Sequence, residues 1–279
     1  KADDILVGPG TKELMFLTQI AFGGEVLLPA PSWVSYQPQA FIAKNKVHWI
    51  QTTSNSNWFP TAELLENKIK NIKEKNLLLF INSPNNPTGT LTPEAEVREL
   101  LSLGPVVVVD ETYHEFSGST VAHLVHEYDN LVVLRSMSKW AGLAGVRLGY
   151  GIMAPELVGY MMGIKHPYNT SVAAQVALFA TLQDTDLLLQ RVRLLVEERE
   201  RMRGMLEDSL GVTCMPSKGN FLLCKFPNGQ ARELQMKLAQ KGIFVRWFSD
   251  ERLTNYLRIS SGKPAETEAL VDTLKELMV

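Results

Sequence analysis

Short, continuous apolar runs recur through the first 150 residues of the chain, and small or polar residues follow each run. These runs lie at residues 5–7, 26–28, 47–50, 77–81, 105–109 and 131–134. Runs of this kind are typical of strands that are covered on both faces. Helical patterns lie between them, including a charged amphipathic stretch over residues 60–75 that predicts a surface helix. Strands and helices that alternate at this spacing predict an α/β fold, with a mostly parallel sheet and helices on both faces.

The pattern changes after Gly151, where long helical stretches replace the regular alternation. We predict helices at residues 172–182 and 184–210, then strands at 212–215, 220–226, 242–247 and 256–260, with helices at 231–241 and 264–277. Short strands and helices mixed within one part of the chain predict a small α+β domain. We therefore divide the chain into a large cofactor-binding domain at residues 1–185 and a small C-terminal domain at residues 186–279.

Polar and aromatic residues follow the ends of the apolar runs. They are Thr11, Trp33, Asn86, Asp110, Tyr113, Ser136 and Lys139. In open parallel sheets, ligands bind in the crevice outside the carboxyl ends of the strands. The sequence therefore predicts that these residues meet at one edge of the sheet.

Lys139 follows the run at residues 131–134, and the hydroxyl residues Ser136 and Ser138 come just before it. A lysine amine in this position can form a Schiff base with an aldehyde cofactor, and neighbouring hydroxyls can donate to the phosphate of that cofactor. Arg147, eight residues later, is a second phosphate-binding candidate. A lone Ser-x-Ser-Lys motif is more often a surface lysine after a strand, so the other candidates decide its meaning.

A glycine turn at residues 8–12 precedes the first predicted helix. Such a turn presents backbone N–H groups, here at Gly10, Thr11 and Lys12, together with the positive end of the helix dipole. These groups can hold a phosphate, although glycine before a helix is most often only a turn.

The remaining candidates suit the ring of a pyridine-aldehyde cofactor. Asp110 can keep a ring nitrogen protonated, which makes the ring an electron sink. Asn86 and Tyr113 can donate to the phenolic oxygen, and Trp33 can cover the ring face, unless it only packs in the core. The freed amine of Lys139 can then carry a proton between the substrate and the cofactor.

Four motifs occur in the order and approximate spacing of one enzyme family. They are Asn86-Pro87-Thr88-Gly89, Asp110-x-x-Tyr113, Ser136-x-Ser138-Lys139 and Arg147. Together they make the sequence resemble the fold-type I pyridoxal-phosphate aminotransferases of class I and II. The resemblance implies the cofactor pyridoxal 5'-phosphate and a homodimer with its sites at the interface. It also implies that Arg258, with Arg246 nearby, binds the acidic group of the substrate, for which arginine offers a planar fork.

Two parts of the chain resemble different branches of that family. From Val106 onward the sequence is most similar to the histidinol-phosphate aminotransferases, for example at residues 109–117 and 134–145. Residues 8–13 and 31–36 look more like the aspartate and aromatic aminotransferases. We expect histidinol phosphate and 2-oxoglutarate as substrates, in histidine biosynthesis. The alternatives are an aspartate or aromatic aminotransferase and a phospho-amino-acid decarboxylase on the same fold.

The family also carries a segment ahead of the glycine turn, which helps to close the site and reaches the partner subunit's cofactor phosphate. We find no counterpart of it here and expect it to be missing from the chain.

Composition excludes several other classes of function. The chain has 279 residues, 45% of them hydrophobic and 21% charged, with a net charge of −2, so charge gives no reason to expect a nucleic-acid or membrane partner. No apolar stretch is long enough to span a bilayer and no signal peptide is recognisable, so we expect a cytoplasmic protein. His123 and His126 lack the further ligands of a metal site, and none is expected. A non-catalytic binding protein of the same fold is disfavoured, because Lys139, Asp110 and Tyr113 are all present.

Overall fold

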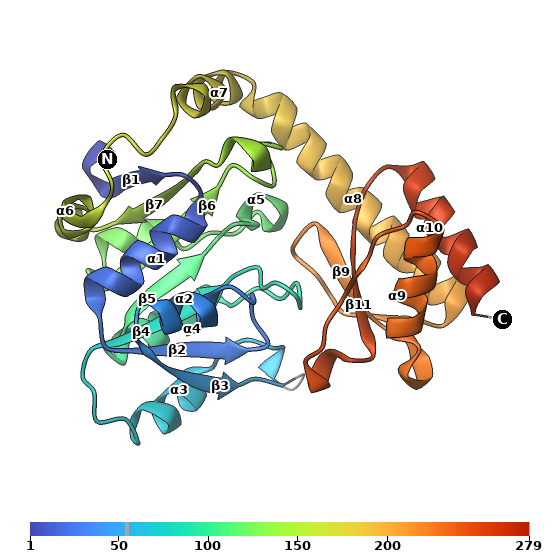
Figure 1. Ribbon diagram of the computed structural model, residues 1–279, viewed down its shortest axis with the longest axis horizontal. Coiled ribbons are helices and arrows are strands. Elements are labelled where there is room, and N and C mark those ends of the chain that lie inside the picture. The colour runs from blue at the N-terminus through green and yellow to red at the C-terminus, as the bar shows by residue number, and fades with distance from the viewer. Residues whose placement is uncertain (54–55, 279) are drawn as a thin grey trace.

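The computed structural model describes residues 1–53 and 56–278 and has two lobes, each built on its own sheet. A long helix, α8 (Thr185–Leu210), runs from one lobe into the other (Figure 1). We call the seven-stranded sheet with its helices the large lobe, and the four-stranded sheet with its helices the small lobe. The domain boundary between residues 185 and 186 stays a prediction.

The large sheet confirms the mostly parallel arrangement. Its strands are β1 (Ile5–Gly8), β2 (Glu25–Ala30), β3 (Lys46–Gln51), β4 (Leu77–Asn82), β5 (Val106–Asp110), β6 (Leu131–Ser136) and β7 (Gly149–Met153). Their order is β1-β7-β6-β5-β4-β2-β3. The five strands from β6 to β3 are mutually parallel, whereas β7 is antiparallel to both of its neighbours. The carboxyl ends of β2, β4, β5 and β6 therefore share one edge.

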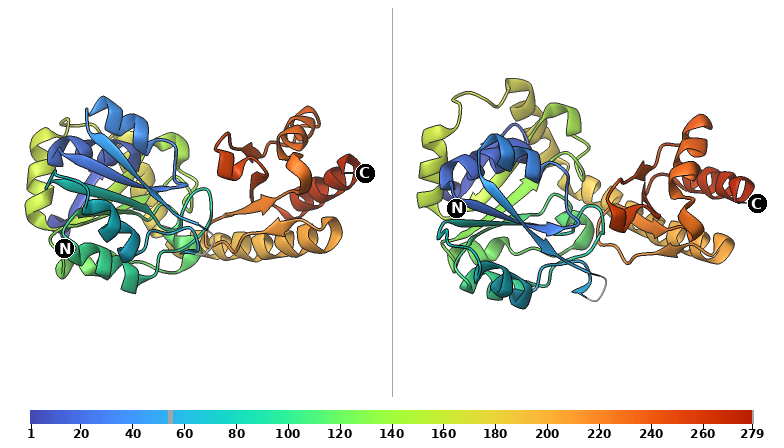
Figure 2. Two further views of the ribbon diagram at one scale, coloured as in Figure 1. Left: turned by 90° about the horizontal axis from the view of Figure 1, so that it is seen from below. Right: turned by 60° about the horizontal axis from the view of Figure 1, so that its bottom comes forward.

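Alternate residues of the central strands face opposite sides, as the two-residue repeat of a strand requires. On one side, Phe80, Val108 and Val132 pack against α1 (Thr11–Phe22), α2 (Tyr36–Ile42) and α6 (Pro155–Ile164). On the other side, Leu79, Val107 and Val133 pack against α3 (Ala62–Ile69), α4 (Glu94–Ser102) and the 3-10 helix η3 (Ala122–His126). Helices thus cover both faces of the sheet (Figure 2), and burial of these apolar strands holds the lobe together.

The small lobe is a compact α+β unit. Its strands are β8 (Thr213–Cys214), β9 (Phe221–Lys225), β10 (Arg246–Trp247) and β11 (Tyr256–Ser260), in the antiparallel order β10-β11-β9-β8. Helices α9 (Ala231–Gln240) and α10 (Pro264–Leu277), with the second half of α8, share one apolar core with this sheet.

Several predicted elements are shorter in the structure than expected, and a local cause is visible for two of them. The helix expected over residues 60–75 is α3, which the side chain of Thr61 caps and which ends at Ile69, so that Ile72 turns back onto the core. The strand expected over residues 242–247 is only β10, because the chain after α9 first turns through Gly242, whose φ is +80°.

Two further α-helices are α5 (His114–Ser117) and α7 (Val172–Gln183), and short 3-10 helices lie at η1 (Ala2–Asp4), η4 (Ala144–Val146) and η5 (Pro227–Gly229). Within residues 1–53 and 56–278, no helix alone has the length and apolar composition needed to cross a membrane. Helices α7 and α8 meet those criteria only as a pair, and they are bent by 80° against each other.

Candidate active site

A cavity of about 320 Å³ lies at the carboxyl edge of the large sheet, where the small lobe faces it. Its walls come from the ends of β4, β5 and β6, the start of α1, and β11 of the small lobe. The predicted residues that line it are Thr11, Lys12, Trp33, Asn86, Asp110, Tyr113, Ser136, Ser138, Lys139, Arg147 and Arg258. All seven residues that were predicted to meet because they follow apolar runs line this one cavity.

Asp110 ends β5, and its carboxylate is buried behind the cavity. Its Oδ2 accepts a hydrogen bond from the Tyr36 hydroxyl over 2.8 Å, and its Oδ1 accepts from the hydroxyl and the N–H of Thr112 over 2.6 and 3.1 Å. Burial raises the pKa of Asp110, and these hydrogen bonds oppose the rise. A cation placed against this carboxylate would restore its ionised form, as a protonated ring nitrogen does.

Lys139 also lines the cavity, with its Nζ 5.9 Å from the centre of the Tyr113 ring. Its pKa is lowered, first because the surrounding protein removes part of its hydration, and then because Arg258 and Arg147 are positive. Asp110 opposes this shift. A lowered pKa leaves more of the amine neutral at a given pH, and the neutral amine is the form that attacks an aldehyde or accepts a proton.

Two side chains can donate hydrogen bonds between Asp110 and Lys139. Burial raises the pKa of Tyr113 to about 12, so its hydroxyl keeps its proton. Asn86 accepts a hydrogen bond from Arg258 Nη1 over 2.7 Å through its Oδ1, and its Nδ2 makes no hydrogen bond within the described residues. Both groups are therefore available to a phenolic oxygen.

The other end of the cavity is built for an anion. The N–H of Ser138 donates to Ser136 Oγ over 3.1 Å, which leaves the Ser136 hydroxyl hydrogen free to donate. Arg147 has a left-handed backbone, with φ at +59°, which costs a non-glycine residue roughly 1–2 kcal/mol. Gly10 precedes α1, and a Cβ on it would lie only 2.5 Å from Arg147 Nη2. A side chain at position 10 would therefore displace the Arg147 guanidinium, and the φ of +91° at Gly10 also favours glycine, although Gly10 itself does not line the cavity.

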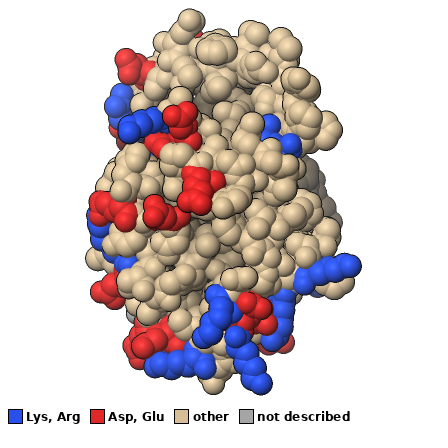
Figure 3. All heavy atoms as spheres, turned by 90° about the vertical axis from the view of Figure 1, so that its left-hand side faces the viewer, with Lys and Arg blue, Asp and Glu red and all other residues tan. Residues whose placement is uncertain are grey.

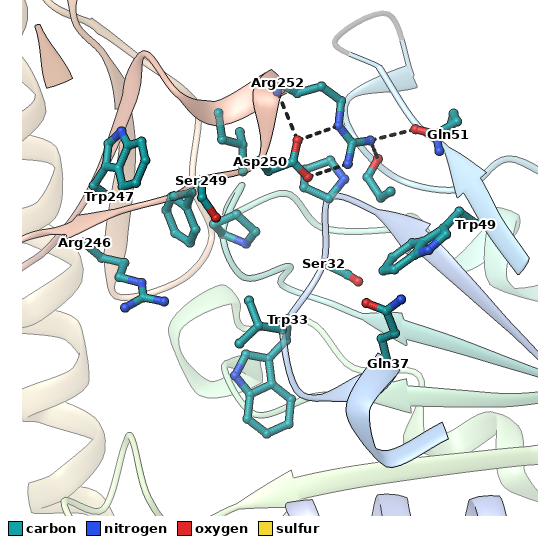
Figure 4. Close-up of a pocket in the computed structure, with 16 residues that line it drawn as sticks. Ser32, Trp33, Gln37, Trp49, Gln51, Arg246, Trp247, Ser249, Asp250 and Arg252 are labelled. Atoms are coloured by element: carbon teal, nitrogen blue, oxygen red, sulfur yellow. Dashed lines mark hydrogen bonds and ion pairs between the residues drawn. The ribbon is translucent and has the colours of Figure 1, made fainter. Parts of the chain in front are cut away.

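Trp33 forms a wall between this cavity and an adjoining one of about 680 Å³, shown in Figure 4. Its ring lies edge-on to Tyr36, at 5.5 Å between ring centres, and the Lys12 ammonium lies 5.9 Å from it. The indole can therefore cover a flat ring that binds between Asp110 and Lys139.

The two predicted substrate arginines are direct cross-strand partners on β11 and β10, yet they line different cavities. Arg258 lines the cavity of Lys139, and its guanidinium lies 5.2 Å from the centre of the Phe221 ring. Its Nε is buried and has no hydrogen-bond partner among residues 1–53 and 56–278. Arg246 is exposed in the adjoining cavity, 5.7 Å from the ring of Phe248.

Sequence reasoning missed three residues of this site, Tyr36, Asn82 and Thr112. Asn82 ends β4, donates to the Asp110 carbonyl over 2.9 Å and accepts from the Asn86 N–H over 2.7 Å. Asn82 could have been predicted, because it ends a strand at the same edge of the sheet, and Thr112 lies inside the motif Asp110-x-x-Tyr113. Tyr36 has no local signal, because its partner is 74 residues away in the chain.

These residues fit pyridoxal phosphate, since the cavity combines a buried carboxylate, two neutral donors, an amine and an anion cradle. When it is bound, that cofactor supplies an electron sink for the α-carbon of an amino substrate. The chain supplies the rest: Lys139 can move the α-proton, Asp110 can hold a ring cation, and Arg258 can bind an acidic group.

Comparison with known proteins gives the same picture. The family model described as aminotransferase class I and II matches residues 1–274. A histidinol-phosphate aminotransferase of Dehalococcoides mccartyi strain CBDB1 is 36% identical over 99% of this chain and 76% of its own length. That of Roseiflexus castenholzii is 46% identical over 72% of this chain and 55% of its own length.

Solved structures share the fold. The histidinol-phosphate aminotransferase of Sinorhizobium meliloti, in complex with pyridoxal-5'-phosphate, aligns with a TM-score of 0.88 at 22% identity, over 99% of this chain and 78% of that chain. An L-threonine-O-3-phosphate decarboxylase of Porphyromonas gingivalis aligns with a TM-score of 0.86 at 23% identity, over 100% and 84%. Likeness at these identities confirms the fold-type I architecture and does not separate the two reactions.

Proposed function

Because this chain belongs to the class I and II aminotransferases, a family of pyridoxal-phosphate-dependent enzymes, we propose that its amino donor is histidinol phosphate and its acceptor 2-oxoglutarate. In this proposal the protein carries out a step of histidine biosynthesis by a ping-pong exchange of one amino group.

The guanidinium of Arg258 is the observation that carries the proposal. It is partly buried in the Lys139 cavity, and within the described residues its hydrogen-bond partner is the neutral Asn86 and no carboxylate. Burial lowers the pKa of Arg258, and the charge of nearby Arg246 adds to that effect. A buried cation without a counter-charge favours an acidic ligand, and a phosphate monoester offers the largest compensating charge. Arg246 would add a second positive charge from the adjoining cavity.

The other site residues have defined roles in this proposal. Lys139 moves the proton at the α-carbon, Asp110 holds the ring nitrogen, and Asn86 and Tyr113 donate to the phenolic oxygen. Trp33 covers the ring. Arg147, Ser136, Ser138 and the N–H groups of Thr11 and Lys12 would hold the phosphate of the cofactor. The N–H of Gly10, also predicted for this role, already donates to the Gly8 carbonyl over 2.7 Å.

We also propose that the protein works as a homodimer. On α7, Val172, Val176 and Phe179 follow the spacing of one helix face, and all three are exposed. Few charged side chains lie at the top of the face in Figure 3, the level at which α7 stands in Figure 1. An uncharged apolar helix face of this kind suits contact with a second copy of the chain.

A half-reaction tests the substrate. The protein is loaded with pyridoxal phosphate, and the visible absorbance of the bound cofactor is followed as single amino donors are added. The donors are histidinol phosphate, aspartate, phenylalanine, glutamate and threonine phosphate, and released carbon dioxide is measured in parallel.

Rapid loss of the visible band with histidinol phosphate, and slow loss with aspartate and phenylalanine, is the expected result. Faster reaction with aspartate or phenylalanine would replace the proposal by an aspartate or aromatic aminotransferase. Release of carbon dioxide from threonine phosphate would replace it by a decarboxylase.

A further inference from the structure

Arg252 of the small lobe binds the large lobe outside the Lys139 cavity. It belongs to the 3-10 helix η6 (Glu251–Leu253), between β10 and β11. Its Nη1 donates to the Ala30 carbonyl over 2.9 Å and to Gln51 Oε1 over 2.8 Å. Its Nε and Nη2 donate to the carboxylate of Asp250 over 2.9 and 2.6 Å, so the guanidinium is held on two sides (Figure 4).

The large-lobe partners of Arg252 are well anchored. Ala30 and Gln51 are the last registered pair of the parallel strands β2 and β3. The Ala30 carbonyl also accepts hydrogen bonds from the hydroxyl and the N–H of Thr52, over 2.9 and 3.2 Å. Arg252 therefore joins the small lobe to the ends of two strands of the large lobe, through the backbone carbonyl of Ala30 and the side chain of Gln51.

The same segment of the small lobe carries Arg258, six residues further on. Arg258 makes a further contact between the lobes, donating to Asn86 Oδ1 over 2.7 Å, close to the Lys218 N–H, which donates to the Gly89 carbonyl over 2.7 Å. In the large lobe the two contacted loops are tied to each other, because Asn85 Nδ2 donates to the Pro31 carbonyl over 3.1 Å. Arg252, Arg258 and these loops thus form one continuous network across the cleft.

The two arginine contacts differ in what a substrate does to them. An acidic group that binds Arg258 competes with Asn86 for Nη1 of that guanidinium. Arg252 lines the adjoining cavity and not that of Lys139, so an acidic group bound to Arg258 does not compete for its contacts with Ala30 and Gln51. We propose that Arg252 is a positioning residue, which fixes the small lobe against β2 and β3 and thereby places Arg258 over the Lys139 cavity.

Hydrogen exchange of backbone amides tests, without any substrate, whether Arg252 holds the small lobe against β2 and β3. We compare the wild type with Arg252→Gln and Arg252→Lys, and use Arg98→Gln as the control. Arg98 matches Arg252 in exposure, 34% against 33%, and binds two carboxylates, but it does so entirely within the large lobe.

In Arg252→Gln, the amides of Thr52 and Asn86 are expected to exchange about tenfold faster, since hydrogen bonds from a charged donor are lost. The amide of Val108, in the middle of the large sheet, is expected to keep its exchange rate. An unchanged rate there shows that the variant has lost the Arg252 contacts and not its fold. Arg252→Lys should lie in between, and Arg98→Gln should match the wild type at all three amides. Unchanged exchange at Thr52 and Asn86 in Arg252→Gln would overturn the proposal.

A kinetic comparison tests the placement of Arg258, and this arm rests on the proposed function. For histidinol phosphate, Arg252→Gln is expected to raise KM about tenfold with little change in kcat, because Arg258 is misplaced. For histidinol, which lacks the phosphate, KM should not change. An equal change in KM for both donors would contradict the inference. If the wild type uses neither donor, the proposed function fails, and the exchange rates still decide the role of Arg252.

Discussion

The hydroxyl of Tyr36 donates a hydrogen bond to Oδ2 of Asp110 over 2.8 Å, and both side chains are buried. The Tyr36 ring stacks on Phe80 at 5.2 Å between ring centres and meets the edge of Trp33 at 5.5 Å. A buried residue of α2 therefore fixes the orientation of the carboxylate that faces the cavity. Without this hydrogen bond, Asp110 would keep only the two donors of Thr112.

Tyr36→Phe should weaken binding of pyridoxal phosphate about tenfold or more, since a hydrogen bond to a charged acceptor is lost. Loss of the donor should also raise the pKa of Asp110 further. Because Asp110 must be ionised to hold a ring cation, affinity should fall at a higher pH than in the wild type as the solution is acidified. Equilibrium dialysis across a pH series measures both effects. Tyr160→Phe, on the exposed side of α6, is the control, and an unchanged affinity in Tyr36→Phe would contradict the prediction.

Gly10→Ala should disrupt the anion cradle, because the added methyl group would displace Arg147. Gly104→Ala is a matched control: Gly104 has a φ of +96° against +91° at Gly10, yet a Cβ there meets no atom within 4 Å. Both variants should lose about 1 kcal/mol of unfolding free energy from backbone strain. Only Gly10→Ala should also lose affinity for pyridoxal phosphate. Equal affinities in the two variants would show that Gly10 serves only the turn.

The amine of Lys139 should titrate below the ordinary lysine value of 10.5. Because Arg258 is the first charged group that contributes to this shift, Arg258→Gln should move the titration toward higher pH. Below its pKa the amine is protonated and does not react, so the reactive range should begin at a higher pH in the variant. The pH dependence of Lys139 labelling by trinitrobenzenesulfonate, read by mass spectrometry, measures this range. Arg98→Gln should leave the profile in place, and an identical profile in Arg258→Gln would refute the assignment.

Phe179→Asp should convert the proposed dimer into monomers, since a carboxylate on the apolar face of α7 would lose its hydration at the interface. Light scattering after size-exclusion chromatography gives the mass. Phe244→Asp is the control, because Phe244 is 82% exposed on the small lobe, against 67% for Phe179 on α7. A dimer that survives Phe179→Asp would place the interface elsewhere, and a wild-type monomer would refute the proposal of a dimer.

Local patterns in the sequence were sufficient to predict the large sheet and the edge of it at which the cavity lies. Each central strand is buried on both faces, so its residues form an unbroken apolar run that is visible in the sequence. Parallel strands end at a common edge, and for that reason Asp110 and Ser136 could be placed together without a structure. The pattern was less useful where burial is one-sided, as in the helix expected over residues 60–75, which ends at Ile69.

The sequence by itself determined the mostly parallel sheet and the edge at which Lys139, Asp110 and Arg147 lie together. Only the tertiary structure decided that Tyr36 reaches Asp110, that Arg246 and Arg258 line separate cavities, and that Arg252 binds Ala30. The physical reason is distance along the chain. Strand burial leaves a local, repeating signal, whereas the hydrogen bond from Arg252 to Ala30 joins residues 222 positions apart and depends on how the two lobes pack.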